Sequence, residues 1–342
     1  LKDLPVDDVI YLLFNKRLPT TEESIAFRRE MGQREQVPDA VYQVLESLPR
    51  EGHPMEWFMV ALNYLGMIEK TGDYREDALN LVARVNTIVA AIFHVREGWG
   101  RPIKPCSDLP FSANFVCMLG MPETHPLLSE VLRLFYVLHM DHGGGNLSTF
   151  VGKSIASGKA DVYASIIGAM AALYGARHGR ANQECLEFVK SIGTTDKDEV
   201  EKRVRDILAS GGLVYGFGHA VLRVEDPRAT VQYEFGRNHF GHDDLVQTAI
   251  ALREVVPEIL KENPKIQNPY PNVDAMSGTL LTAVGLNKPE YYTLLFGWSR
   301  IVGIAAQIVD ERTFPGKKDG LPIYRPRYLA KDQPPRRLAP DA

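Results

Sequence analysis

The sequence contains little cysteine and no uninterrupted apolar run of membrane-spanning length. Its three cysteines, Cys106, Cys117 and Cys185, are an odd number at unrelated spacings. Because they form no zinc or redox motif, we expect a reducing compartment and buried, unreactive thiols. No stretch approaches the roughly 18 uninterrupted apolar residues of a transmembrane helix. These absences favour a globular protein without disulfides.

Strand patterns, excess charge and several catalytic motifs are also lacking. A net charge of −4 over 342 residues gives no reason to expect a nucleic acid or an anionic membrane as partner. Period-two alternation is nearly absent, and GGLVYGFG at residues 211–218 is too short and glycine-rich for a substantial strand. There is no GxSxG elbow, Walker phosphate loop or GxGxxG after a strand. The sequence therefore argues against serine hydrolases of the elbow type, P-loop proteins and dinucleotide-binding folds.

Helical periodicity is what the chain has in abundance. Apolar residues recur at spacings of three and four over residues 6–15, 39–48, 57–68, 75–95 and 127–140. LPTTEE at residues 18–23 provides a helix start. We predict an all-α fold of a dozen or more helices, in a chain long enough for one large domain or two unequal ones.

The two ends of the chain differ from its middle. Residue 1 is a leucine that leads directly into an expected helix, so we expect a further segment to precede it. Residues 322–342 are rich in proline and arginine and cannot pack as a helix. We expect them to form an extended arm that lies on a partner subunit.

A first polar cluster interrupts the helical pattern at residues 138–150. His139 and His142 are three residues apart, and a run of three glycines follows, which lets a backbone approach a ligand. Two histidines at this spacing can share a metal ion, but neither an HExxH spacing nor a third ligand accompanies them. We favour a contact with a polar substrate and predict no metal site.

His178 and Asp274 are candidates for acid–base chemistry. His178 lies just before the predicted helix 181–192, where the positive end of a helix dipole disfavours an imidazolium. A neutral imidazole can donate a hydrogen bond to an oxygen that gains charge, although a histidine that merely packs is an equal alternative. Asp274 lies at the mouth of an apolar run, where desolvation would raise its pKa toward that of a useful base. The alternative is an ordinary N-cap aspartate.

Arginines close to glycine and apolar residues suggest an anionic ligand. In GFGHAVLRVEDPR at residues 216–228, His219 follows two glycines, and the turn former Asp226-Pro227 separates Arg223 from Arg228. Guanidinium groups suit carboxylates and phosphates, while a surface loop with solvated arginines is the alternative. Arg300 lies inside an apolar helix, where a charge almost always has a partner or a ligand. Together, these histidines, the aspartate and the arginines suit acid–base chemistry on a small polyanionic substrate.

Taken in order, these motifs resemble the citrate synthase family. The matching segments are HPM at 53–55, DHGGGN at 141–146, HGRANQE at 178–184, GFGHAVLR at 216–223, DPR at 226–228, YPNVDAMSG at 270–278, FGWSR at 296–300 and PIYRP at 322–326. The similarity extends from LPTTEE to about residue 327, and several motifs in register make it specific. The HAVLR form is similar to the variant of mitochondrial enzymes and of some bacteria.

The resemblance implies an all-α homodimer with two domains in each chain. Residues 1–179 would begin the large domain, residues 180–285 would form a small mobile domain, and residues 286–342 would complete the large domain. No tightly bound cofactor is implied, because acetyl-CoA and CoA act as co-substrate and product. We expect a bacterial cytoplasm, with the mitochondrial matrix as the alternative location.

The implied reaction condenses acetyl-CoA with oxaloacetate through an enol or enolate and then hydrolyses citryl-CoA to citrate and CoA. Asp274 would remove the methyl proton, and His178, supported by Ser148, would hydrogen-bond the thioester oxygen. His219 would polarise the ketone of oxaloacetate. Such enolisation needs a base together with an oxyanion partner, since the proton is weakly acidic.

The resemblance also assigns the substrate contacts. The residues that would bind substrate are His142, Asn146, Ser148, Arg228, Phe296, Arg300 and Arg325. Among them, His142, Arg228 and Arg300 would hold the oxaloacetate carboxylates, and Arg325 would reach the partner subunit's site. Those that would line the acetyl-CoA pocket are Val214, Gly216, Gly218, Asn272 and Arg223, with Arg223 at the CoA phosphates. Two alternatives stay open. One is a 2-methylcitrate synthase that uses propionyl-CoA with the same residues, and the other is a helical scaffold without catalytic activity.

Overall fold

The computed structural model describes residues 3–102, 104–106, 109–121, 124–219, 222–317 and 320–326. Within these ranges the chain forms fifteen α-helices and one 3₁₀ helix, and its only extended pairing is an isolated bridge between Phe217 and Pro271. The prediction of an all-α fold is confirmed. The helices are α1 (Val6–Asn15), α2 (Thr21–Arg34), α3 (Asp39–Ser47), α4 (Pro54–Glu69), α5 (Tyr74–Glu97), α6 (Phe111–Leu119), α7 (Leu128–His139), α8 (Leu147–Ser157), α9 (Val162–Leu173), α10 (Ala181–Ile192), α11 (Lys197–Ala209), α12 (Pro227–His239), α13 (Asp244–Lys261), α14 (Asp274–Ala283), η1 (Pro289–Tyr291) and α15 (Tyr292–Arg312).

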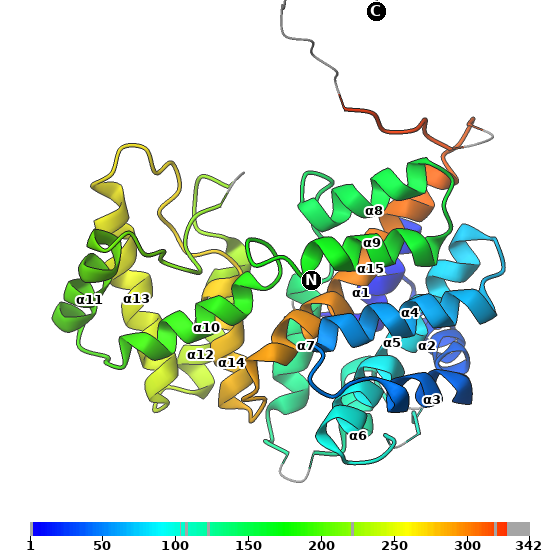
Figure 1. Cartoon of the computed structure of the whole chain (residues 1–342), viewed down its shortest axis with the longest axis horizontal. Coiled ribbons are helices and arrows are strands. Elements are labelled where there is room, and N and C mark those ends of the chain that lie inside the picture. The colour runs from blue at the N-terminus through cyan, green and yellow to red at the C-terminus, as the bar shows by residue number, and fades with distance from the viewer. Residues whose placement is uncertain are drawn as a thin grey trace, which may run out of the picture.

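The helices gather into two groups (Figure 1). Helices α10 to α14 pack on one another, chiefly α10 and α13 on α14 and α11 on α13. The larger group holds α1 to α9 and α15, and α15 packs against α5, α7, α8 and α9. Contacts of α7 with α14 and of α10 with α15 join the groups. The division into domains at residues 180 and 285 stays a prediction, although both positions lie in the connections between the groups.

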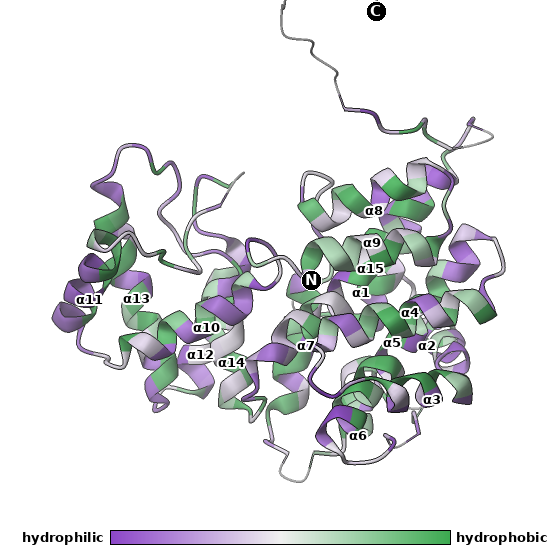
Figure 2. Cartoon of the chain, in the orientation of Figure 1, coloured by the Kyte–Doolittle hydropathy of each residue, from purple (hydrophilic) through white to green (hydrophobic). Residues whose placement is uncertain are grey.

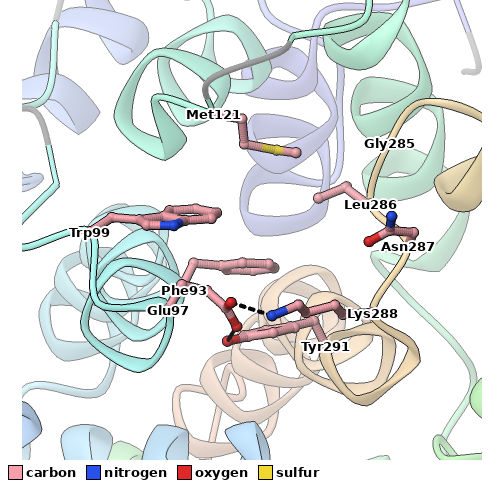
Figure 3. A pocket seen from close by; sticks show the side chains of 9 residues that line it. All are labelled: Phe93, Glu97, Trp99, Met121, Gly285, Leu286, Asn287, Lys288 and Tyr291. Carbon is pink, nitrogen blue, oxygen red and sulfur yellow. Dashed lines mark hydrogen bonds and ion pairs between the residues drawn. The ribbon is translucent and has the colours of Figure 1, made fainter.

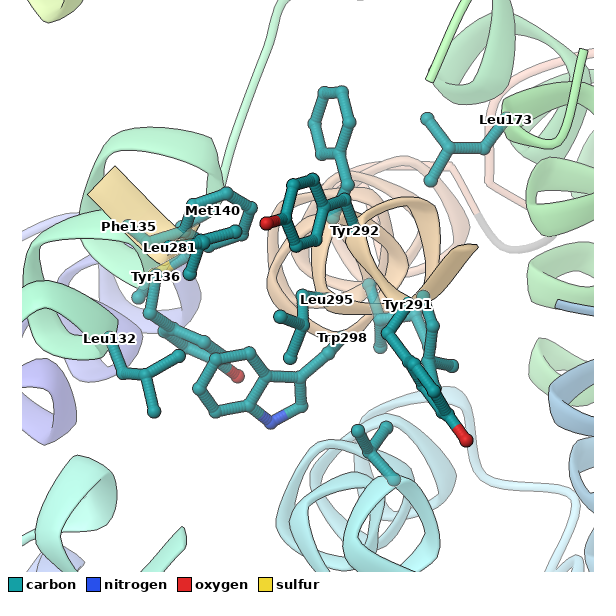
Figure 4. Packing of buried hydrophobic residues seen from close by; sticks show 14 of the residues in the cluster. Leu132, Phe135, Tyr136, Met140, Leu173, Leu281, Tyr291, Tyr292, Leu295 and Trp298 are labelled. Atoms are coloured by element: carbon teal, nitrogen blue, oxygen red, sulfur yellow. The ribbon is translucent and has the colours of Figure 1, made fainter. Parts of the chain in front are cut away.

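Helix α15 forms the centre of the larger group (Figure 4). Its Trp298 is fully buried and packs against Phe115 and Tyr136, with ring centroids 4.3 Å away in both cases. The indole N–H donates to Asn86 Oδ1 at 2.6 Å, so that burial leaves this polar atom satisfied. Truncation of so large a buried ring typically costs about 3–5 kcal/mol. The rigidity of this core matters because Arg300 belongs to the same helix.

Two helical segments, Tyr74–Glu97 and Pro289–Arg312, are long and apolar enough to cross a membrane. In the fold, however, 89% and 94% of their most apolar windows are buried. Apolar side chains all around a helix suit the centre of a large globular protein as well as a bilayer. Both segments are therefore core helices, and the outlying α11 shows the more polar surface typical of the periphery (Figure 2).

Local signals in the sequence locate several helix ends. Thr20 caps α2 in a reciprocal capping box with Glu23, as LPTTEE predicts.

The expectation of buried thiols is wrong for Cys106, which is exposed, whereas Cys117 is half-buried and Cys185 is buried. The predicted C-terminal arm lies outside the described residues from residue 327 onward.

Candidate active site

The glycine-rich segment 216–219 lies against the segment that precedes α14. Gly218 N–H donates to Tyr270 O at 2.9 Å, and Asn272 N–H donates to Gly216 O at 2.9 Å. The Asn272 side chain adds a third bond, from Nδ2 to Gly218 O at 3.0 Å. These bonds bring His219 to the same region as the start of α14, far away in the sequence.

Gly216 is required by the close approach of these segments. Its φ is +82°, and a Cβ there would lie 2.7 Å from Cys185 Sγ and 2.8 Å from Ala275 Cα. A side chain would therefore be strained by the backbone conformation and would also collide with the first turn of α14. The glycine thus sets the distance between this loop and Asp274.

Gly216→Ala is expected to destabilise the protein by at least about 2–3 kcal/mol, because strain and collision add. Gly72→Ala is the matched control, since its φ is +89° but no atom lies within 4 Å of the Cβ position. It should cost only about 1 kcal/mol. Urea unfolding of both variants measures the difference, and equal losses would contradict the packing account.

Asp274 is the first residue of α14, and its carboxyl group is enclosed. Its N–H donates to Asn272 Oδ1 at 2.9 Å, while Val273 occupies the N-cap position without a side-chain cap bond. The residue is half-buried, but Oδ1 has no exposed surface and no hydrogen-bond partner. Burial raises the pKa of Asp274 to about 6, although Arg228 and Arg300 act in the opposite direction. The side chain is not the N-cap of α14, and its basicity suits proton abstraction near neutral pH.

His178 lies in the turn between α9 and α10 and contacts Ser148 at the start of α8. Its Nε2 lies 2.9 Å from Ser148 Oγ and accepts the Ser148 N–H at 3.2 Å. A ring nitrogen that accepts a hydrogen bond has no proton, so the neutral ring carries its proton on Nδ1. Burial, and then Arg300, lower the pKa of His178 to about 4. The sequence predicted that the helix terminus would keep this ring neutral. In the structure, burial is the main reason for its lowered pKa.

Arg300 is buried, with 1% of its surface exposed, and it has no carboxylate partner among the described residues. Its Nε donates to His139 O at 2.8 Å, and one Nη donates to Asn146 Oδ1 at 3.3 Å. The guanidinium also lies over the Phe296 ring, 4.7 Å from the centroid. Burial, followed by Arg228, lowers the pKa of Arg300 to about 9, so it stays charged at neutral pH. These bonds use two of its five N–H donors.

His142 and His219 face each other from the two groups of helices. Their ring centroids are 5.8 Å apart in an edge-on arrangement. Nδ1 of His219 accepts the Leu222 N–H at 2.9 Å, which places the proton of the neutral ring on Nε2. Burial lowers the pKa of His142 to about 4, with Arg228 and Arg300 acting in the same direction. Both imidazoles thus border the same cationic region.

Asp226 is the site residue that the sequence analysis missed. It was interpreted as part of a turn, yet it is 2% exposed and holds Arg228, whose Nη2 lies 2.6 Å from Asp226 Oδ2. Its own N–H donates to Pro271 O at 3.2 Å, which fixes it to the loop before α14. The signal in the sequence is the aspartate two residues before an arginine at a helix start, where the carboxylate also caps α12.

The remaining candidate residues from the sequence differ in their exposure. His139, at the end of α7, is fully buried, and its Nδ1 donates to Phe135 O at 2.8 Å, so it is structural. Val214 is half-buried, while Arg223 and Arg325 are exposed. No cluster of three or more His, Cys, Asp or Glu residues with metal-binding geometry occurs in the described part of the chain.

One guanidinium connects the centre electrostatically. Arg300 acts on the pKa values of His142, His178 and Asp274, three side chains that come from separate parts of the sequence. An enclosed carboxylate, neutral imidazoles, the buried Arg300 and the half-buried Arg228 together define an acid–base enzyme for a small anionic substrate. Together with the all-helical fold, this site defines the class of protein as an all-α acid–base enzyme.

Known proteins identify the family. The model described as "Citrate synthase, C-terminal domain" matches residues 2–327. A mitochondrial citrate synthase of Citrus maxima is 38% identical over 345 residues, covering 95% of this chain and 72% of the relative. A mitochondrial 2-methylcitrate synthase of Yarrowia lipolytica is 33% identical over 347 residues, covering 96% and 73%. The crystal structure of citrate synthase from Thermotoga maritima has a TM-score of 0.83 at 28% identity and covers 99% of this chain and 88% of that one. The chain belongs to the citrate synthase family, as the motifs predict.

The acid limb of a pH profile tests the assignment of Asp274. Because Asp274 must be ionised to accept a proton, activity should fall as the pH drops through its pKa of about 6. His178 contributes no limb there, since its pKa of about 4 leaves it neutral. The measurement is kcat/KM for the thioester substrate against pH, and a flat profile from about pH 5 to about pH 7 would contradict the assignment.

Proposed function

We propose that the chain is a citrate synthase, which condenses acetyl-CoA with oxaloacetate and hydrolyses the resulting citryl-CoA. The observation that carries this proposal is the enclosed carboxyl of Asp274, whose raised pKa and lack of a hydrogen-bond partner suit a base. We infer the substrates from membership of the family, and we infer the individual steps of the reaction from the residues of the site.

Proton abstraction is the first step. The Asp274 carboxylate removes a methyl proton of acetyl-CoA, and negative charge develops on the thioester oxygen. His178 donates its Nδ1 hydrogen to that oxygen, since Ser148 occupies Nε2 and holds the ring. A neutral donor that is fixed before the reaction stabilises the enol or enolate without reorganisation.

Oxaloacetate is held by the cationic region. Arg300 and Arg228 bind its carboxylates, and His142 contributes a further contact. Asn146 and Phe296 orient Arg300 through a hydrogen bond and a ring contact. His219 directs its Nε2 hydrogen to the ketone, which becomes the hydroxyl of the product. Such clamps convert a bimolecular step into an effectively unimolecular one.

CoA lies along residues 214–219 and 222–223 in this proposal. The exposed Arg223 meets the CoA phosphates, and Val214, Gly216, Gly218 and Asn272 line the acetyl end of the pocket. Closure of the α10–α14 group over both substrates excludes water until the carbon–carbon bond has formed. Hydrolysis of citryl-CoA then makes the overall reaction irreversible in practice.

A homodimer is part of the proposal. Apolar side chains are exposed along α4 (Val60, Met67, Ile68) and α8 (Leu147, Phe150), and the apolar helix α9 packs against both. Exposed apolar surface of this extent favours association of two copies. Arg325 is exposed after Tyr324, whose N–H donates to Ser157 Oγ at 2.9 Å, and we propose that it reaches the partner subunit's site.

Light scattering tests the dimer. The purified chain should have a mass of twice 38.3 kDa, and Met67→Asp should shift the equilibrium toward the monomer, because a charge would be buried at the interface. Lys197→Asp, on the far group of helices, is the control. A monomeric parent protein would contradict the proposal.

The activity itself is tested by thiol release from acetyl-CoA. Release should require oxaloacetate and follow saturation kinetics in both substrates. Absence of an oxaloacetate-dependent signal would instead favour a helical scaffold without activity.

A 2-methylcitrate synthase is the second candidate, because a relative with that name is 33% identical over most of the chain. The described catalytic residues serve either substrate, and one methylene in a pocket is worth only about 1–3 kcal/mol. A panel of acyl-CoAs separates the two candidates. A higher kcat/KM for propionyl-CoA than for acetyl-CoA would reverse their order. The bacterial cytoplasm stays our predicted location, with the mitochondrial matrix as the alternative, and the named relatives are described as mitochondrial.

A further inference from the structure

A cavity of about 100 Å³ shares no lining residue with the candidate active site, and Figure 3 shows the side chains that surround it. It is walled by the C-terminal end of α5, by Met121 after α6, and by the link that connects α14 to η1. The residues that line it are Phe93, Glu97, Trp99, Met121, Gly285, Leu286, Asn287, Lys288 and Tyr291. None of them belongs to the proposed catalytic or substrate-binding set, and the walls are almost entirely apolar.

The aromatic part of the cavity is fixed in place. Phe93 and Tyr291 stack with ring centroids 4.0 Å apart. Trp99 is 41% exposed, but its backbone N–H donates to His94 O at 2.8 Å, and its ring meets the His94 ring edge-on with centroids 5.6 Å apart. His94 is held in turn by Nε2 contacts to two carbonyl oxygens, at 2.8 and 3.0 Å. A rigid aromatic wall costs little ordering when a ligand binds.

The charged groups at the cavity are satisfied by each other. Glu97 forms an ion pair with Lys288 and accepts the Tyr291 hydroxyl at 2.7 Å. A charged ligand would therefore meet no uncompensated partner. The exposed Asn287 at the rim offers hydrogen-bonding groups for one polar substituent.

Size and lining together select a small aromatic ligand. At about 100 Å³ the cavity is smaller than the enclosed apolar cavities of about 150 Å³ that bind benzene, so one ring would fill it and a substituent would extend to the rim, where Asn287 and Lys288 are exposed. Rings and a thioether, from Phe93, Trp99 and Met121, contact aromatic ligands favourably through edge and sulfur interactions. The ligand class that fits is an uncharged single ring with one hydroxyl group, for which 4-methylphenol is a suitable probe.

The position of the cavity lets a bound ligand affect how α14 is held relative to the larger group of helices. Residues 285–288 follow α14 directly, and α14 begins with Asp274 at its other end, about 15 Å away by helix geometry. A molecule in the cavity contacts both this link and α5, and so fixes α14 relative to the larger group of helices. This step rests on the proposed function, in which the α10–α14 group moves during turnover.

We propose that this cavity binds a small uncharged phenolic molecule and that its occupancy slows catalysis by fixing the link between α14 and α15. Both parts are measurable separately. Binding is read from the tryptophan next to the cavity, and slowing is read from kcat.

The binding experiment uses the full chain labelled with 5-fluorotryptophan and titrated with 4-methylphenol. The three tryptophans give three fluorine resonances, which single Trp→Phe variants assign. The Trp99 resonance should shift saturably, with a dissociation constant on the order of 1 mM. Trp57 and Trp298, which are 2% and 0% exposed, are internal controls and should not move. No saturable shift at Trp99, or equal shifts at all three, would overturn the site.

The kinetic experiment compares the parent chain with Met121→Phe, in which a phenyl ring replaces the thioether and occupies part of the cavity. Saturating 4-methylphenol should lower kcat of the parent at least about threefold and leave Met121→Phe unaffected. Leu18→Phe, at an exposed apolar position elsewhere, should respond like the parent. Binding without a change in kcat would overturn the regulatory part, as would equal inhibition of Met121→Phe. An inactive parent chain would contradict the proposed function and leave the binding result readable.

Discussion

Asp274→Ala is expected to lower kcat at least about a hundredfold while the affinity for oxaloacetate changes little. In our proposal this carboxyl is the base. Burial raises its pKa to about 6, its enclosed Oδ1 has no hydrogen-bond partner, and an alanine offers no group that could accept the proton instead. Steady-state kinetics by thiol release, with oxaloacetate and acetyl-CoA varied in turn, measure both quantities.

Two companion variants make this result specific. Asp274→Asn keeps the shape but cannot accept the proton, so it should be about as inactive as the alanine variant. Asp244→Ala removes an exposed aspartate from the same first position of α13, and its kcat should stay near that of the parent. A near-normal kcat for Asp274→Ala would remove Asp274 from the role of base.

Arg300→Leu is expected to raise the KM for oxaloacetate roughly 30-fold or more, about 2 kcal/mol of lost binding. Arg300 is a buried cation that forms no ion pair with a carboxylate within the described residues, and Asp141 and Asp274 act on its pKa only from a longer range, so an anionic ligand can pair with it directly. Leucine has a similar size and removes the buried charge, which keeps the loss of stability small. Initial rates against oxaloacetate concentration measure the change.

Arg312→Leu is the matched control, since Arg312 is the other buried arginine of α15 and binds Leu321 O rather than the site. This variant should lose stability without a change in the KM for oxaloacetate. A thermal unfolding scan shows that Arg300→Leu is folded. If that variant bound oxaloacetate as well as the parent, Arg300 would not hold the substrate.

The periodicity of the sequence predicted most helices because each buries one face or all of its surface. The run 75–95 is embedded in α5, and the run 181–192 coincides with α10. Residues that start or stop a helix were informative because they act through local contacts, as in the capping box of Thr20 and Glu23. The exposure of the cysteines was less predictable, because burial depends on tertiary packing: Cys106 is exposed and Cys185 is buried.

The environment of the site depends on contacts distant in sequence. Asp226 looked like a turn residue because its partner Pro271 O lies in another loop. His178 was expected to be neutral through a helix terminus, whereas burial and Arg300 are the causes found. The cavity beside Trp99 had no signal in the sequence, because its walls come from three separate segments.

Citrate formation by the purified chain tests the central claim most directly. Acetyl-CoA and oxaloacetate are incubated with the enzyme, CoA is counted as free thiol, and citrate is counted by mass spectrometry. We predict one citrate for each CoA released and neither product from Asp274→Ala above about one hundredth of the parent rate. Thiol release without citrate, or without oxaloacetate, would contradict the account.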